Sequence, residues 1–222
     1  MPPEPGEPMS YVDLYCERLA PGLMAEPVNT LSNLAFFAAA WLVWRRAASA
    51  GAWRARGRLL AALIALIGAG SFTFHAFATT WAEALDEFPI LLFQLVFLGL
   101  YFRGVTGWGR AAVAGFLAAF VAAGVGAAGF PAVLNGSLVY LPALAVLSAI
   151  GAGEAVARRD GWPCLLGAAG TFVVSVGFRS ADLAVCPRFA LGTHFLWHLI
   201  NAMVLALAVL GLLLSARSGE TR

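Results

Sequence analysis

The hexapeptide THFLWH, residues 193–198, places His194 and His198 four positions apart in a long apolar stretch. Residues at this spacing share one face of an α-helix, so the two imidazoles would project side by side. The third histidine of the chain, His75, also lies in an apolar stretch. Ionisable groups inside a membrane often mark functional sites, although a histidine there can also serve as a hydrogen-bond partner between helices. Three histidines with a fourth position open are the ligand set of catalytic zinc, so the trio predicts a zinc site that activates water.

Two other polar side chains accompany His75. Ser71 precedes it by one helical turn and shares its face. Asp86 and Glu87 are expected to begin the next helix. Hydrolysis needs a group that takes and returns protons, which predicts that role for Asp86, and a donor for the developing oxyanion, for which Ser71 is a candidate. Glu87 is expected to be a charge at the membrane interface or a charge that supports the residues of the site without taking part in the chemistry. Taken alone, Ser71 could instead serve helix packing, and Asp86 could lie at the headgroup boundary.

The elements that must position these residues are membrane-spanning helices. Of the 222 residues, 61% are hydrophobic and 12% charged, and the mean hydropathy is +0.82. A spanning helix needs roughly 20 apolar residues. The apolar runs cover 27–44, 59–82, 88–102, 111–153, 161–178 and 189–216. Because 111–153 is too long for one crossing and is divided at residues 129–131, the sequence predicts an all-α, polytopic bundle of seven transmembrane helices.

Arginine placement predicts the orientation of this bundle, because basic residues concentrate on the cytoplasmic side. One predicted face carries only Arg18, Arg179 and Arg188. The opposite face carries eleven, namely Arg45, Arg46, Arg54, Arg56, Arg58, Arg103, Arg110, Arg158, Arg159, Arg217 and Arg222. The N-terminus is therefore expected outside and the C-terminus in the cytoplasm. The acidic opening residues lack the basic start of a cleaved signal peptide. A lysine-free composition rich in Ala, Gly, Leu and Arg favours a bacterial inner membrane.

Because successive helices cross the membrane in opposite directions, the candidate residues fall on one side of it. His75 falls near the outer end of the second helix, and His194 and His198 fall in the first two turns of the seventh. At 1.5 Å per residue, all three lie about 5–12 Å below the outer surface. The expected organisation is an acidic N-terminal segment at 1–26, one helical domain at 27–216 and a cytoplasmic tail at 217–222. No feature of the sequence indicates a nucleic-acid or protein partner.

The N-terminal segment contains the other concentration of polar groups. Asp13, Glu17 and Glu26 precede the first helix, on the same side as the histidines. Such carboxylates could bind Ca²⁺ together with backbone carbonyls, or could form a solvated acidic tail. Cys16 and Cys186 also fall on the outer face, where a disulfide could form. Spacing alone leaves that bridge and three unpaired cysteines as equal alternatives.

The combination of DLYCER, AEPVNTLSN, GSFTFHA with LDEFP, and THFLWH resembles the alkaline ceramidase family. That family belongs to a wider group of seven-helix membrane hydrolases that includes the adiponectin and progestin receptors. The resemblance implies a zinc-dependent amidase that cleaves ceramide into a sphingoid base and a fatty acid. It implies that His75, His194 and His198 are the zinc ligands and that Ser71 and Asp86 are the catalytic residues. It also implies a calcium site at Asp13, Glu17 and Glu26, and a disulfide between Cys16 and Cys186.

The calcium-site motif is where this sequence departs from the family pattern. Eukaryotic members typically have tryptophan after the aspartate and asparagine soon after the cysteine–glutamate pair. Here Leu14 and Tyr15 follow Asp13, and Arg18 follows Glu17. Fewer residues also separate Cys16 from Glu26. Backbone carbonyls or water would have to replace any missing calcium ligand, whereas the zinc motif has no such gap.

Two other classes of function are compatible with the same pattern. One is a receptor or sensor in which zinc is structural, and the other is a bis-histidine haem protein or a metal transporter. The predicted function is an integral-membrane, zinc-dependent amidase with its active site toward the periplasm. Its partners would be the bilayer and a lipid substrate, either ceramide or another N-acyl lipid.

Overall fold

The fold was analysed in a computed structural model that describes residues 10–220. Residues 1–9 of the expected N-terminal segment, and Arg222 with its expected cytoplasmic placement, lie outside this range. Within it the chain is helical, with one isolated bridge between Tyr11 and Thr79. The elements are α1 (Pro27–Ser32), α2 (Leu34–Ala47), η1 (Gly51–Trp53), α3 (Arg54–Phe77), α4 (Thr80–Gly104), α5 (Arg110–Ala128), η2 (Val133–Tyr140), α6 (Leu141–Val156), α7 (Trp162–Val185) and α8 (His194–Glu220).

Six helical segments of the described chain are long and apolar enough to cross a membrane, and they make this an integral membrane protein. They contain α3, α4, α5, α6, α7 and α8. The first predicted span forms two helices, α1 and α2, which meet at Asn33, and the 14 residues of α2 are short for a crossing. The predicted division at residues 129–131 is confirmed, since α5 ends at Ala128 and the chain turns before α6.

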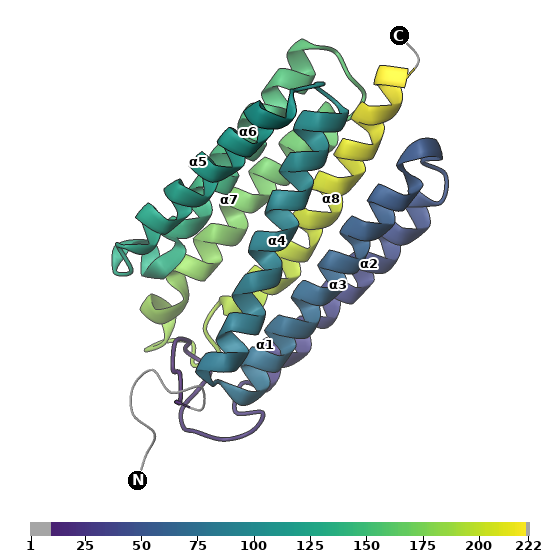
Figure 1. The fold of residues 1–222 in the computed structure, drawn as a ribbon. Coiled ribbons are helices and arrows are strands. Elements are labelled where there is room, and N and C mark those ends of the chain that lie inside the picture. Colours follow the sequence, from purple (N-terminus) through teal and green to yellow (C-terminus); the bar gives the residue numbers. More distant parts are fainter. Residues whose placement is uncertain (1–9, 221–222) are drawn as a thin grey trace.

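The central helices of the bundle are α3 and α8. In their apolar windows 61% of residues are buried, compared with 11% in α5, which is peripheral. Helix α8 contacts α1, α2, α3, α4 and α7. Figure 1 shows α8 running through the bundle between α2 and α3 on one side and α5, α6 and α7 on the other. Residues 10–26, the α3–α4 turn and the α7–α8 loop gather at one end, here called the N-terminal end.

Three helix boundaries at this end differ from the predicted ones. Helix α3 ends at Phe77 because Ala78 adopts a left-handed conformation, with φ of 46°. Helix α4 then starts at Thr80, so Asp86 and Glu87 lie inside it and do not begin it. Helix α7 continues to Val185, beyond the predicted apolar run at 161–178, and therefore includes Asp182. At the other end, α8 continues to Glu220, so most of the expected tail at 217–222 is helical.

The N-terminal segment is fastened across the ends of the helices. The amide of Val12 donates to the carbonyl of Ala78 at 2.9 Å, and the amide of Met24 donates to the carbonyl of Ala76 at 2.9 Å. Thr80 donates to the carbonyl of Ser10 at 3.2 Å. Since these bonds involve the turn between α3 and α4, they place residues 10–26 directly beside the end of α3 that carries His75.

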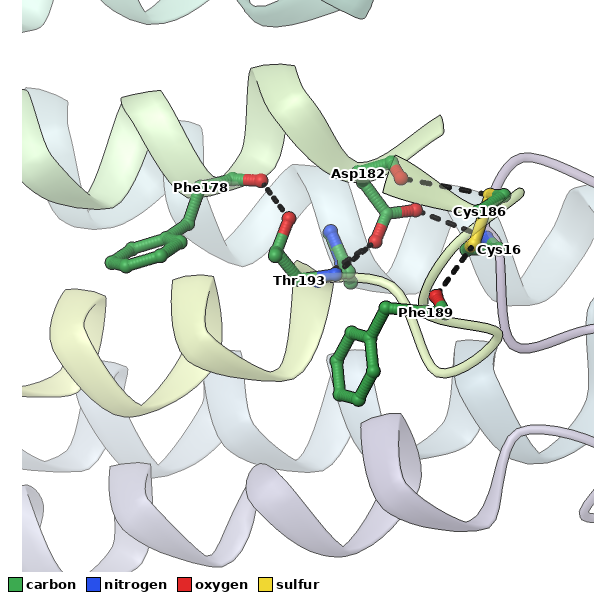
Figure 2. The surroundings of a disulfide bond; sticks show 7 residues. Cys16, Phe178, Asp182, Cys186, Phe189 and Thr193 are labelled. Carbon is green, nitrogen blue, oxygen red and sulfur yellow. Dashed lines mark hydrogen bonds between the residues drawn. A yellow bond between two sulfur atoms is a disulfide. The ribbon is translucent and has the colours of Figure 1, made fainter. Parts of the chain in front are cut away.

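A disulfide and a buried carboxylate hold the same segment to the α7–α8 loop. Cys16 is bonded to Cys186, which confirms the pairing that the family resemblance implied. The carboxylate of Asp182 accepts from the amide of Cys16 at 3.0 Å, from Thr193 at 2.7 Å and from His194 at 2.9 Å. Figure 2 shows this carboxylate between the disulfide and the start of α8. Gly192 has φ of +63°, and a Cβ there would overlap Asp182. Asp182 therefore fixes both the segment and the first residue of α8.

We predict that thiol counting will report this bridge. With Cys16 and Cys186 paired, Cys164 is the free cysteine of the chain. Denatured, unreduced protein should react with one equivalent of a maleimide, and reduced protein with three. Cys16→Ser should lower the unfolding free energy by about 2–4 kcal/mol, since the bridge closes a long loop. Cys164→Ser is the matched control, and three reactive thiols without reduction would contradict the bridge.

Candidate metal centre

Three buried histidines meet at the N-terminal end of the bundle. His75 comes from the last turn of α3, and His194 and His198 come from the first two turns of α8. Their side chains are almost fully buried, with exposures of 0%, 2% and 1%. One potential ligand atom from each lies within 4.8 Å of the other two. The ring centroids are 4.6–5.1 Å apart, a spacing that suits a small ion, whereas a haem would need a slot between the rings.

The hydrogen bonds of the rings leave one nitrogen of His75 and one of His194 without a partner in the described part of the chain. His75 Nδ1 is 2.6 Å from Glu26 Oε2, and His198 Nδ1 is 2.7 Å from the Ser32 hydroxyl. His75 Nε2 and His194 Nδ1 are buried without a hydrogen-bond partner among the described residues. Buried polar atoms without partners are rare and costly, and a bound metal would satisfy them. The trio therefore fits a metal ion, and neutral imidazole suits zinc among other transition metals.

Glu26 links His75 to a buried arginine. Its Oε1 accepts from Arg18 Nε at 2.5 Å, and its Oε2 contacts both His75 and, at 2.9 Å, Asn29 Nδ2. Burial acts to raise the pKa of Glu26, but its hydrogen bonds with His75, Arg18 and Asn29 together bring the pKa below its usual value. The carboxylate is thus ionised and can receive the Nδ1 proton of His75, which leaves Nε2 of that ring for a metal.

Ser71 and Asp86 meet where α3 and α4 pack closely. A Cβ at Gly70 would overlap the Leu85 carbonyl oxygen, so only glycine allows this approach. The Ser71 hydroxyl is hydrogen-bonded to the Asp86 carboxylate, which also interacts electrostatically with His75 and Arg179. Ser71 is buried and Asp86 is partly exposed. The two predicted catalytic residues are therefore brought together with His75, while Glu87 lines a neighbouring cavity.

Sequence reasoning did not single out two residues that border the centre. The ring of Tyr15 stacks on His194, with centroids 3.6 Å apart. Burial raises the pKa of the Tyr15 phenol, so it stays protonated. Arg179 bonds to the Asn135 carbonyl and the Ser137 hydroxyl, each at 2.9 Å, and interacts with Tyr15 and Asp86. For Arg179 the available signal was its position, because it is one of the few arginines on the predicted outer side.

The three carboxylates considered for calcium are not brought together as a metal-binding group; among the described residues that arrangement is confined to the histidines. Glu17 accepts from the amides of Val28 at 2.7 Å and Asn29 at 2.8 Å, and so stabilises the start of α1. Glu26 is bound by Arg18, His75 and Asn29, as described above. Asp13 is exposed. Glu17 and Glu26 thus already have partners that neutralise or satisfy them.

Comparison with known proteins gives one family. The model of the family described as ceramidase matches residues 6–221, nearly the whole chain. No curated protein matches the chain. The match extends over the N-terminal segment, α3, α4 and α8, and therefore includes every residue of the centre described above.

We predict that Glu26 is needed for both stability and metal binding. Glu26→Gln leaves Arg18 buried without a counter-charge and should lower the unfolding free energy by about 3–5 kcal/mol. The loss of the partner behind His75 should weaken metal affinity about 10- to 100-fold. Thermal unfolding and competition with a chelating dye measure these effects. Asp13→Asn, which changes an exposed carboxylate, is the control, and equal behaviour of the two variants would contradict the prediction.

Proposed function

Because this chain belongs to the ceramidase family, a family of amide-hydrolysing enzymes, we propose that it is an integral-membrane, zinc-dependent amidase. Its substrate would be ceramide or a related N-acyl lipid, and the products a free fatty acid and a sphingoid base or other amine. The observation that carries this proposal is the convergence of His75, His194 and His198, fully buried and with ring nitrogens left for an ion, beside the Ser71–Asp86 pair.

The side chains have distinct tasks in the proposed reaction. Zinc held by the three histidines would lower the pKa of a coordinated water to about 7 and polarise the amide carbonyl. Asp86 accepts a proton from the attacking water and delivers it to the departing amine nitrogen, so that the C–N bond breaks as the acid forms. In this structure the Ser71 hydroxyl bonds to Asp86 and orients it. The predicted oxyanion role of Ser71 would require that hydroxyl to turn toward the substrate carbonyl.

Two cavities beside the centre support a lipid substrate. An apolar cavity of about 70 Å³ lies between α3, α4, α5, α6, α7 and α8 and is lined by Trp197 and Asn201, which flank His198 along α8. A larger one of about 460 Å³ lies between α4, α5 and the η2–α6 segment. Both include Gln94 and Tyr140 in their lining. Exposed side chains such as Phe88 and Val125 border the larger cavity, so a lipid tail would enter sideways from the bilayer.

The orientation proposed for the bundle places the centre toward the periplasm of a bacterial inner membrane. Arg18, Arg179 and Arg188 lie at or near the N-terminal end, while the turns that follow α2, α4 and α6 lie at the other end (Figure 1). Those turns and the adjoining helix ends carry most of the remaining arginines. Since basic residues are retained in the cytoplasm, the N-terminal end would face outward.

We predict that two variants will separate metal binding from chemistry. His198→Ala should lose both zinc, by elemental analysis, and release of fatty acid from N-acyl lipids. Asp86→Asn should keep its zinc but lose about 10²- to 10⁴-fold in activity, because it cannot accept a proton. Full activity of Asp86→Asn would contradict the proton-transfer role of Asp86. Zinc binding without amide hydrolysis in the wild type would favour a receptor with a structural metal, and a Soret band in the purified protein would contradict the zinc assignment.

We also predict that filling the smaller cavity will affect long acyl chains selectively. Leu147 lines this cavity and is 8% exposed, whereas Val156 on the same helix is 86% exposed. Leu147→Trp should lower kcat/KM for a long-chain N-acyl substrate about tenfold or more, since a lost apolar contact of 1–3 kcal/mol has this effect. A short-chain substrate should be affected less. Val156→Trp is the matched control, and an equal loss for both chain lengths would place the acyl chain elsewhere.

A further inference from the structure

The guanidinium of Arg18 is enclosed at the N-terminal end of the bundle, with a side-chain exposure of 0%. Each of its three nitrogens has a partner. Nε donates to Glu26 Oε1 at 2.5 Å, Nη1 donates to the Gly22 carbonyl at 3.1 Å, and Nη2 donates to the His75 carbonyl at 2.8 Å. Arg18 therefore contacts His75 twice, directly through its backbone and indirectly through Glu26.

These acceptors are the kind that a hard cation would use. One carboxylate and two backbone carbonyls converge on Arg18, and Ca²⁺ takes six to eight such oxygens. The same carboxylate was expected to bind calcium, but Arg18, His75 and Asn29 occupy it. Both oxygens of Glu17 accept amide protons from the start of α1, and Asp13 is exposed. The residues present therefore do not fit a calcium ion.

We infer that Arg18 is a built-in cation that takes the place of calcium here, and that it is a positioning residue for the metal centre. This inference rests on the zinc site of the proposed function. Arg18 holds Glu26 against Nδ1 of His75 and holds the His75 carbonyl, so that Nε2 of the ring faces the other two histidines. The centre is consequently independent of external calcium.

The chemistry of the guanidinium suits this role. It is always charged, and its planar fork can bond three acceptors in fixed directions, whereas an ammonium is a compact point charge. Its single charge balances the single charge of Glu26, so no excess positive charge is placed beside a second cation. The disulfide at Cys16 and the bond from its amide to Asp182 fix the backbone two residues before Arg18. The covalent chain thus supplies the cation at any calcium concentration.

The test measures metal binding by the full-length protein in detergent, without reference to activity. Calcium titration by calorimetry should show no stoichiometric binding to the wild type up to about 1 mM, the weakest range of extracellular calcium sites. Zinc should bind at one ion per chain. Arg18→Ala should weaken zinc affinity about 10- to 100-fold in dye competition, as for other partners behind metal ligands. Arg18→Lys, which keeps the charge, should recover part of this loss.

Arg188→Ala provides the control, because Arg188 is an exposed arginine at the same end of the bundle; its zinc affinity should equal that of the wild type. Stoichiometric calcium binding by the wild type would overturn the inference, as would wild-type zinc affinity in a folded Arg18→Ala protein. If Arg18→Ala does not fold, Arg18→Lys decides, since affinity equal to that of the wild type would show that the fork is not needed. A wild type that binds neither metal would defeat the proposed function and leave the absence of a calcium site standing.

Discussion

The carboxylate of Glu26 lies between a guanidinium and an imidazole, and the arrangement of the metal centre depends on this contact. A charged group without a partner is very costly in an apolar interior, so Arg18 and Glu26 must be buried together. Once they are paired, Glu26 can accept the Nδ1 proton of His75 at 2.6 Å. This fixes which ring nitrogen remains for an ion. The orientation of a residue in α3 is therefore set by a segment that precedes the first helix.

The rest of the N-terminal end can be understood as support for that contact. Arg18 can reach Glu26 and the His75 carbonyl only if residues 10–26 cross the ends of α3 and α8. The disulfide to Cys186 and the Asp182 carboxylate hold the segment there and also fix the start of α8, where His194 lies. Close packing of α3 on α4 at Gly70 then brings Ser71 to Asp86. Polar groups from four separate parts of the chain satisfy one another in this way, as an apolar environment requires.

Sequence patterns predicted those features that depend on the lengths of the apolar runs and on the alternating direction of successive helices. Apolar runs predicted the six helices that are long and apolar enough to cross a membrane. The alternating direction of successive helices predicted that His75 lies at the same end as His194 and His198, as the structure has it. Helix ends were less predictable, because apolar residues continue past Phe77 and the left-handed Ala78 has no distinctive neighbours. The partnership of Arg18 with Glu26 could not be foreseen either, since residues 10–26 have no periodicity that fixes their path. The available clue was the exception to the arginine bias. Of the three arginines on the predicted outer side, Arg18 is buried and Arg179 is partly buried against the centre, while Arg188 is exposed.

The central claim is that His75, His194 and His198 hold a zinc ion with one position open for water. X-ray absorption at the zinc edge of the purified protein tests it most directly. The predicted spectrum shows three imidazole nitrogens and one oxygen at about 2.0–2.1 Å. A shell of four protein ligands, a sulfur ligand at about 2.3 Å, or a protein without zinc would contradict it.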